Sequence, residues 1–521
     1  MSVQTSSKVT GLTERALAGT GWSTIASVGK QLLTIASVTT VARVLGPHAY
    51  GLMGMAVIIT GFISNFRDLG TATAIIQRRN VPRLLYSSVF WLNVLLGVAL
   101  CILVAGTAPI AGRFFHTPEV APILRVLSLS LLIASCGVVH LAILYREMRF
   151  KALGSVDLSA ALASYIVALT GALAGMGVWS LVFASVIGSI VSTAGYWFCA
   201  RFRPRFEFDW AEVRSIARFS SNLSAFGIVN YGYRNADNLI VGRVLGSTPL
   251  GFYQMAYNLM LTPISNISSV IAGVLFPAFS KIQDDNERFR NAYVRACMLT
   301  ALLTFPVMAG LGVVADPMIR AVLGTKWLGA IRPFQILAAV GLVQSLYTTV
   351  GVIYQAKGRT DWMFRWGVVV LITTVTAFLI GVRFGINGVA AAYAITFLAV
   401  LTIPGFAIPF RLIGLSFWDF ARALLPQLLI TGGMAGVCIA WQMALAALRI
   451  GNAWIVLLST SLIGAGAYVG ALAVSRPDVL DLVNEILGNS SHGLAATALS
   501  LLRRLRLLRS SPAAEAAPEA V

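Results

Sequence analysis

Apolar residues fill most of the chain in long blocks that short polar stretches interrupt. Each block is about 20 residues long, the length that an α-helix needs to cross a hydrocarbon core of roughly 30 Å. Fourteen spans are predicted, at residues 17–42, 49–66, 84–108, 121–144, 153–175, 178–200, 218–242, 250–276, 293–315, 333–354, 362–384, 386–410, 424–447 and 453–474. The pattern therefore predicts an all-α integral membrane protein with about 14 transmembrane helices.

The composition excludes the other broad classes of protein. Hydrophobic residues make up 57% of the 521 residues and charged residues only 11%, whereas an ordinary soluble domain has about 25% charged residues. A soluble fold cannot bury so much apolar surface, because single cores stop growing near roughly 250 to 300 residues. Intrinsic disorder of the whole chain is excluded as well, since disorder requires low hydrophobicity.

A segment near the start of the chain recurs 200 positions later. Residues 43–56 and 243–256 share the pairs Arg43/Arg243, Val44/Val244, Leu45/Leu245, Gly46/Gly246, Gly51/Gly251, Met55/Met255 and Ala56/Ala256. The turn between the first and second spans is thus predicted to reappear between the seventh and eighth. Six spans separate the copies, an even number, so both copies cross the membrane in the same direction. Parallel repeats of this kind are one design of secondary transporters.

The repeat predicts two six-helix lobes that face each other across a central pathway. The N-lobe covers residues 17–200 and the C-lobe covers residues 218–410. The other segments are a cytoplasmic N-terminus at 1–16, a cytoplasmic amphipathic linker at 201–217, two extra C-terminal helices at 424–474, and a cytoplasmic tail at 475–521 with a basic amphipathic helix and a disordered end.

In the linker, arginines at 201, 203 and 205 alternate with phenylalanines at 202, 206 and 208. Bases interleaved with aromatics can bind RNA, but two spans flank this segment, so a position at the membrane surface is favoured. No nucleic-acid partner is expected. Asp209 and Glu212 have the spacing of a capping box, which predicts a helix start there.

The net charge of +19 follows the predicted topology. With fourteen spans both termini lie on one side, and alternate loops can be compared for the bias of Lys and Arg towards the cytoplasm. The loops opposite the termini carry only Arg43, Arg113, Arg125, Arg243, Arg320, Lys326, Arg332, Arg383 and Arg449. Lys30 and Arg234 lie within spans, and every other Lys or Arg lies on the side of the termini. Both termini are therefore predicted to be cytoplasmic.

Charged residues inside the spans are candidate functional residues, because an ionisable group at the centre of a bilayer costs at least about 2.5 to 3.5 kcal/mol. Lys30 lies in the first span, and Arg234 and Asp237 lie in the seventh. The seventh span also carries Asn230, Tyr231 and Asn238, and is too polar to face lipid. These six residues are predicted to line a water-filled cavity.

Structural explanations stay open for the same residues. Arg234 and Asp237 are spaced for a local ion pair that joins helices, and Lys30 could extend its ammonium group to the interface. In the functional reading the three charges sum to +1, which favours an anionic substrate group such as a phosphate. His140, in the fourth span, is interpreted as a packing residue.

Enzymatic signatures are absent from the sequence. It contains no Gly-x4-Gly-Lys-Ser/Thr phosphate loop, no His-Glu-x-x-His and no Gly-x-Ser-x-Gly, which are motifs of ATP hydrolysis, zinc proteolysis and serine hydrolysis. We therefore expect no catalytic residues, no metal site and no cofactor.

Several motifs together resemble a known family. They are Ala42-Arg43-Val44-Leu45-Gly46, Arg67-Asp68-Leu69-Gly70, Asp237-Asn238-Leu239-Ile240-Val241-Gly242-Arg243, Leu323-Gly324-Thr325-Lys326-Trp327 and Gln355-Ala356-Lys357-Gly358-Arg359. Spread in order over roughly residues 15–410, they resemble the bacterial polysaccharide transporter (O-antigen flippase-like) family. This family belongs to the multidrug/oligosaccharidyl-lipid/polysaccharide flippase superfamily.

The resemblance implies a flippase with a V-shaped central cavity that works by alternating access in the bacterial inner membrane. Its substrate would be an undecaprenyl-diphosphate-linked oligosaccharide, the repeat unit of a lipopolysaccharide or exopolysaccharide. Lys30 and Arg234 would then meet the diphosphate or acidic sugars, and the Asn and Tyr side chains of the seventh span would meet the glycan. Membrane lipids and a polysaccharide polymerase are the partners implied.

Two other functions remain open from the sequence. An ion-coupled multidrug antiporter would require acidic residues grouped within a lobe, and Asp237 is the only deep acid. A membrane polysaccharide polymerase would need a sizeable acidic outer loop, and the predicted outer loops hold only Glu119 and Asp316.

Overall fold

The structure is a computed structural model that describes residues 26–67, 70–78 and 81–475, apart from the side chains at 215–230, 233, 268–278 and 280–281. The described residues form helices and connecting turns, with no β-strand among them. Two compact units share the chain. The first comprises Met1–Leu259, Ile319–Leu337 and Phe364–Leu401, and the second comprises Met260–Met318, Ala338–Met363 and Thr402–Val521. The predicted segments 1–16 and 476–521 lie outside the described residues.

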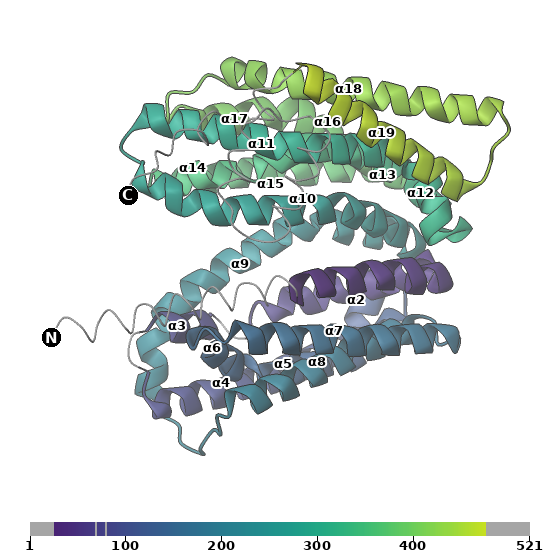
Figure 1. Ribbon diagram of the computed structural model, residues 1–521. Helices are drawn as coiled ribbons and strands as arrows, with labels where there is room; N and C mark the ends of the chain where they lie inside the picture. The colour runs from purple at the N-terminus through teal and green to yellow at the C-terminus, as the bar shows by residue number, and fades with distance from the viewer. Residues whose placement is uncertain (1–25, 68–69, 79–80, 476–521) are drawn as a thin grey trace, which may run out of the picture. The chain divides into compact units, whose positions relative to one another are not determined.

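The first unit is built from long helices that lie side by side (Figure 1). It contains a helix at residues 26–45, α2 (Pro47–Ser64), α3 (Thr71–Gln77), α4 (Arg83–Phe114), α5 (Val120–Ser135), α6 (Val138–Arg146), α7 (Phe150–Leu173), α8 (Val178–Ala200), α9 (Trp210–Leu245), η1 (Ile319–Leu323), η2 (Thr325–Ala330), η3 (Val382–Phe384), α16 (Gly385–Ile395) and η4 (Thr396–Leu401). The pairs α4 with α5 and α7 with α8 pack along their lengths.

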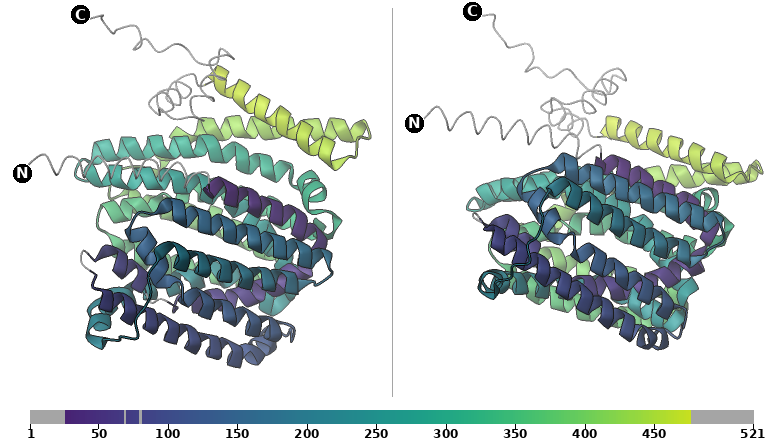
Figure 2. Two further views of the ribbon diagram at one scale, coloured as in Figure 1. Left: turned by 60° about the horizontal axis from the view of Figure 1, so that its bottom comes forward. Right: turned by 90° about the horizontal axis from the view of Figure 1, so that it is seen from below.

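The second unit is a smaller group of helices. It contains α11 (Asn286–Val313), α12 (Ala315–Met318), α14 (Val350–Ala356), α17 (Thr402–Phe410), α18 (Phe417–Ala447) and α19 (Ala453–Ser475). Helix α18 packs against both α11 and α19, which is visible in the further views of Figure 2. Three helices contribute residues to both units: α10 (Ser247–Lys281), α13 (Ile331–Tyr347) and α15 (Thr360–Gly381).

The helices confirm a protein that crosses a membrane several times. Nine helices of the described chain are long and apolar enough to span a bilayer, or ten if the bent pair α5 and α6 is one span. Their outer faces expose large apolar side chains, such as Ile102 at 67%, Leu462 at 74% and Leu429 at 65%. Exposed apolar surface on this scale requires a lipid environment. The figure of fourteen spans stays a prediction.

Three predicted spans are interrupted in the structure. The span at 121–144 consists of α5 and α6, bent by 42° at Cys136 and Gly137. The span at 333–354 breaks between α13 and α14, and the span at 386–410 passes through the π-helix η4. Such breaks need neighbouring groups to satisfy the freed backbone, and hydropathy does not detect them because the side chains stay apolar.

Aromatic side chains form the core of the second unit. Phe279, Phe289, Tyr293, Phe406 and Phe410 are buried in one cluster. In the first unit, the buried ring of His140 stacks on Trp197, and its Nε2 lies 3.1 Å from the carbonyl oxygen of Phe202. The interpretation of His140 as a packing residue agrees with this geometry.

Candidate functional site

The two copies of the repeat have the same backbone conformation. Gly46 follows the helix at 26–45 with φ 81° and ψ 177°, and α2 begins at the next residue. Gly246 follows α9 with φ 89° and ψ −172°, and α10 begins at the next residue. Glycine adopts positive φ without the steric penalty of other residues. The prediction that one turn occurs twice is confirmed.

The two turns pack against each other reciprocally within the first unit. A methyl group on Gly51 would overlap the carbonyl oxygen of Ser247, and a methyl group on Gly251 would overlap the carbonyl oxygen of Pro47, the residue equivalent to Ser247. Farther along, Gly54 lies against the side chain of Gln254, its equivalent position. Contacts exchanged between equivalent positions are the signature of two-fold symmetry. The starts of α2 and α10 therefore lie side by side and run in the same direction.

A segment from the second half of the chain covers the first turn. The indole Nε1 of the fully buried Trp327 donates a hydrogen bond to the carbonyl oxygen of Ala42 at 2.8 Å, and Lys326 Nζ donates to the carbonyl oxygen of Val44 at 2.8 Å. These carbonyls belong to the last turn of the helix at 26–45, where backbone acceptors lack partners within the helix. Arg43 donates in return to the carbonyl oxygen of Ala321 at 3.2 Å.

A segment from the first half of the chain covers the second turn. The ring of Phe115 packs on Gly242, and Arg243 contacts the imidazole of His116. The guanidinium of Arg243 also lies 5.3 Å from the centre of the Phe114 ring. Each turn is thus covered by residues from the other half of the chain.

A polar chain links the two turns at their surface. His48 Nε2 lies 3.3 Å from Glu119 Oε2, and its Nδ1 lies 2.8 Å from Ser247 Oγ. The sequence analysis did not single out His48 or Ser247 as functional residues. Their positions inside the repeated segments were the available signal, because equivalent turns of a two-fold pair must meet near the axis.

Among the predicted cavity residues, Tyr231 and Asp237 connect helix α9 to its neighbours. Tyr231 Oη donates to the carbonyl oxygens of Val57 and Ile58 on α2, each at 3.1 Å. Asp237 is 4% exposed, and its carboxylate accepts from Tyr253 Oη at 3.0 Å and from the amide of Asn238 at 2.7 Å.

Neighbouring Asn238 is also buried, and its Oδ1 has no partner among the described atoms. A buried amide oxygen without a partner is costly, so this position is poised to accept a hydrogen bond. The side chain of Asn230 lies outside the described residues.

The two predicted cations are both exposed. Lys30 and Arg234 form no ion pair in the described part of the chain, and the structure does not pair Arg234 with Asp237. The local ion pair that the sequence allowed is therefore not formed, because Asp237 is directed towards Tyr253 instead. Both cations keep their donor groups available.

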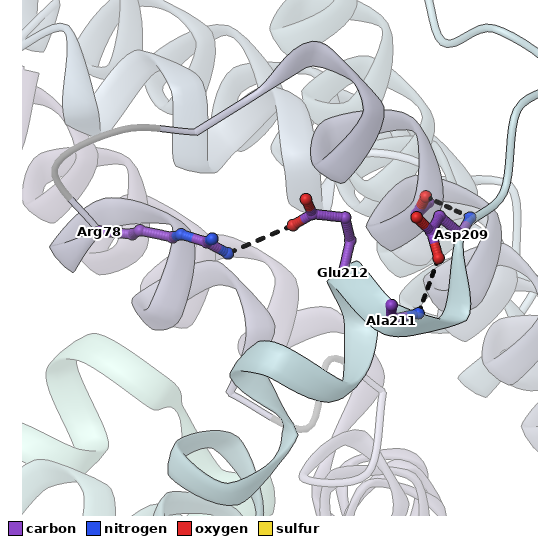
Figure 3. Close-up of polar contacts among 5 residues, drawn as sticks. Arg78, Asp209, Ala211 and Glu212 are labelled. Atoms are coloured by element: carbon purple, nitrogen blue, oxygen red, sulfur yellow. Dashed lines mark hydrogen bonds and ion pairs between the residues drawn. The ribbon is translucent and has the colours of Figure 1, made fainter.

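At the other end of helix α9, polar contacts fix its first turn (Figure 3). Asp209 Oδ1 accepts from the amide of Ala211 at 2.8 Å, so the predicted helix cap is confirmed, and α9 begins at Trp210 within the stretch predicted as linker. The amide of Asp209 donates to Ser88 Oγ at 2.9 Å, and Glu212 pairs with Arg78 at 3.4 Å instead of closing a capping box.

Loops that the sequence assigns to one side of the membrane thus lie together. The segments near residues 46, 116, 246 and 325 meet at the paired turns, and all four belong to the loops predicted opposite the termini. Arg78 and Glu212 come from two loops predicted on the side of the termini. The alternation of the spans explains both groupings.

Known proteins share this sequence over most of its length. The lipopolysaccharide biosynthesis protein WzxC of Escherichia coli is 31% identical over 83% of this chain and 90% of its own length. The teichuronic acid biosynthesis protein TuaB of Bacillus subtilis is 27% identical over 81% of this chain and 88% of its own. The succinoglycan biosynthesis transport protein ExoT of Rhizobium meliloti is 26% identical over 69% of this chain and 73% of its own.

Solved structures show the same fold. The lipid II flippase MurJ in an inward closed conformation superposes with a TM-score of 0.74 at 18% identity, over 88% of this chain and 99% of that one. An inward-facing multidrug transporter of the MATE family superposes with a TM-score of 0.61 at 17% identity, over 74% of this chain and 94% of that one. The family model described as polysaccharide biosynthesis protein matches residues 40–332. The chain therefore belongs to the polysaccharide biosynthesis protein family, the assignment that its motifs predicted, and it has the fold of the lipid II flippase.

Proposed function

We propose that this protein is a flippase that moves an undecaprenyl-diphosphate-linked oligosaccharide from the cytoplasmic to the periplasmic leaflet of the bacterial inner membrane. The oligosaccharide is the repeat unit of a surface polysaccharide, and the protein acts as a transporter without catalytic residues. The names of its relatives in lipopolysaccharide and succinoglycan synthesis support this substrate class. A polysaccharide polymerase that consumes the delivered repeat unit is the proposed partner.

The reciprocal pairing of the two repeat turns is the observation that carries the proposal. The charge distribution assigns these turns to the periplasmic side, and their packing through Gly51 and Gly251 leaves no room between their backbones. The pairing would therefore close the periplasmic end of a pathway, and separation of the turns would open it. Parallel repeats that move against each other in this way are the basis of alternating access.

The exposed cations are proposed as contacts of the diphosphate. Lys30 and Arg234 lack acidic partners among the described residues, so their donors are free to bind an anion. Asn230 and Tyr231 would contact the sugars from α9. Asp237 and Asn238 would hold α9 against α10 through Tyr253 and leave the Oδ1 of Asn238 as an acceptor for a substrate hydroxyl.

The remaining predicted architecture belongs to the same proposal. It comprises fourteen spans, lobes at 17–200 and 218–410, the linker at 201–217, two accessory helices at 424–474, and cytoplasmic termini at 1–16 and 475–521. Attachment of an accessible tag or reporter to either terminus would test the orientation. Both termini are expected to react only from the cytoplasmic side.

Deletion of the protein tests the function directly. We expect a lipid-linked oligosaccharide to accumulate on the cytoplasmic leaflet, where an enzyme added to sealed, right-side-out vesicles cannot reach it. Complementation with the full chain should restore access from the outside. Accumulation on the periplasmic leaflet would instead indicate a polymerase, and normal polysaccharide with altered drug resistance would indicate a multidrug antiporter.

A further inference from the structure

A basic cavity of about 710 Å³ lies in the second unit, where α11 begins and the chain turns from α17 into α18. None of the proposed transport residues belongs to it. It is lined by Arg290, Asn291, Val294 and Arg295 of α11 and by Gly414, Leu415, Ser416 and Asp419. One wall is therefore the first turns of a membrane-spanning helix, and the opposite wall is a tight turn.

The turn that forms the second wall is fixed by its own hydrogen bonds. Gly414 has φ 65°, a conformation that favours glycine, and the amide of Leu415 donates to the carbonyl oxygen of Phe410 at 3.0 Å. Ser416 Oγ accepts from the amide of Trp418 at 3.2 Å and caps α18. The shape of the cavity does not depend on a bound ligand.

The charge of the cavity is positive. Asp419 has a partner outside the lining, because Arg422 lies 3.8 Å from its carboxylate. Arg290 donates one hydrogen bond to the carbonyl oxygen of Gly414 at 3.4 Å, which orients a guanidinium that has five N–H donors. Arg295 and Asn291 make no hydrogen bond or ion pair in the described part of the chain. Two cations therefore face the cavity without an acid to neutralise them.

The cavity lies at the level of the membrane interface. It is formed at the starts of α11 and α18, which are both apolar enough to span a bilayer. Trp418, next to the capping Ser416, is 67% exposed. Exposed tryptophans next to apolar spans are typical of the headgroup region, and the loops that form the cavity are those predicted on the cytoplasmic side.

We propose that this cavity binds the phosphate group of an anionic phospholipid of the cytoplasmic leaflet. Arg290 and Arg295 would share the phosphate oxygens, since guanidinium groups bind phosphate through paired hydrogen bonds. Asn291 would donate to the remaining headgroup oxygens, and Trp418 would lie against the glycerol region. Basic pockets between membrane helices are known to hold anionic headgroups. The inference is independent of the transported substrate.

Native mass spectrometry of the full chain in detergent, titrated with phosphatidylglycerol, tests the proposal. We expect Arg290→Gln with Arg295→Gln to weaken binding of the first lipid by at least about tenfold, the loss of one charge-assisted contact. Arg288→Gln with Arg365→Gln removes the same charge from exposed positions outside the cavity and should leave the affinity within about twofold. Equal affinities of these two double variants would overturn the proposal.

Further arms separate the lipid from other ligands and from misfolding. Arg295→Gln alone removes an exposed side chain that has no partner in the described protein, so the variant should fold, and its affinity should still fall by about tenfold. Glycerol phosphate at millimolar concentration should not displace the lipid. Full displacement by glycerol phosphate, or equal binding of zwitterionic phosphatidylcholine, would refute a site for anionic phospholipid.

Discussion

Trp327 shows how a single side chain can complete the end of a distant helix. Its indole donates to the carbonyl oxygen of Ala42, and its ring packs edge-on against Tyr50 and Phe252 at 5.4 and 6.1 Å between ring centres. Ala42 also accepts from the amide of Gly46 at 3.0 Å. The indole bond therefore adds to a helix end that is already partly satisfied, and fixes it against the second half of the chain.

Replacement of Trp327 by phenylalanine keeps an aromatic ring but removes the indole donor. We expect the free energy of unfolding to fall by about 1 to 3 kcal/mol, because a buried hydrogen bond is lost and a small void remains. The melting temperature of the purified protein in detergent measures the effect. Trp418→Phe, at an exposed position, is the matched control and should not change it. A Trp327→Phe protein that melts with the parent would contradict the capping role.

The two exposed cations predict a loss of transport without a loss of protein. Lys30→Ala or Arg234→Ala should reduce export of the polysaccharide at least about tenfold, because each removes a charged contact with a phosphate group. Immunoblotting of membranes should show normal amounts of protein. Arg422→Ala, an arginine whose side chain is 81% exposed on α18, should export normally. Full export by both cavity variants would eliminate an electrostatic role for these cations.

At the scale of elements, helix α9 and the paired turns determine what the first unit can do. α9 is joined to α2 by Tyr231 and to α10 by Asp237. Its first turn is fixed to the loop after α3 through Arg78. A helix with polar contacts at both ends and in its middle can transmit a displacement from one side of the membrane to the other.

The glycines at the paired turns predict a steric effect of one added methyl group. Gly51→Ala places its Cβ on the carbonyl oxygen of Ser247, and backbone cannot move aside as a flexible side chain can. We expect the turns to separate, with a loss of about 1 to 3 kcal/mol in the stability of the paired state. Gly466→Ala on α19, where nothing lies within 4 Å, is the control.

Disulfide trapping measures that separation. In a chain whose native cysteines are replaced, His48→Cys with Ser247→Cys should oxidise readily, because the parent side chains are in contact. Adding Gly51→Ala should slow formation of the crosslink, and adding Gly466→Ala should leave the rate unchanged. Equal rates for the two glycine variants would contradict tight packing of the turns.

The predictability of these elements depended on how local their signals are. The spans and the repeated turn were predictable, because hydropathy and the pairing of Gly46 with Gly246 are written in adjacent residues. The bend after Ser135 was not, since both flanking segments are equally apolar. The direction of Asp237 was also beyond the sequence, because an acid three residues from an arginine can equally reach a tyrosine on another helix.

At the scale of the whole molecule, the family assignment was predictable and the covering contacts were not. Motifs in order along the chain identify the family without any knowledge of their roles. The motif ending in Lys326 and Trp327 is an example: its residues were recognisable, but their function as donors to the helix end near Ala42 required the structure.

The crosslink between the turns also predicts an effect on the complete transport cycle. Oxidised His48→Cys with Ser247→Cys should hold the turns together and stop export, because the periplasmic end could no longer open. Lipid-linked oligosaccharide should then collect on the cytoplasmic leaflet, and a membrane-permeant reductant should restore export. Each single cysteine variant should export normally under oxidising conditions. Export that continues with the crosslink complete would refute opening at this end.

The exchange of contacts between the turns has an evolutionary consequence. Gly51 on Ser247 and Gly251 on Pro47 are the self-complementary contacts that two identical chains make in a symmetric dimer. An ancestor half as long could have formed this interface before its gene was duplicated and fused. After fusion the two copies could diverge only where they do not meet, so the glycines persist while Trp327 and Phe115 now cover the turns with different chemistry.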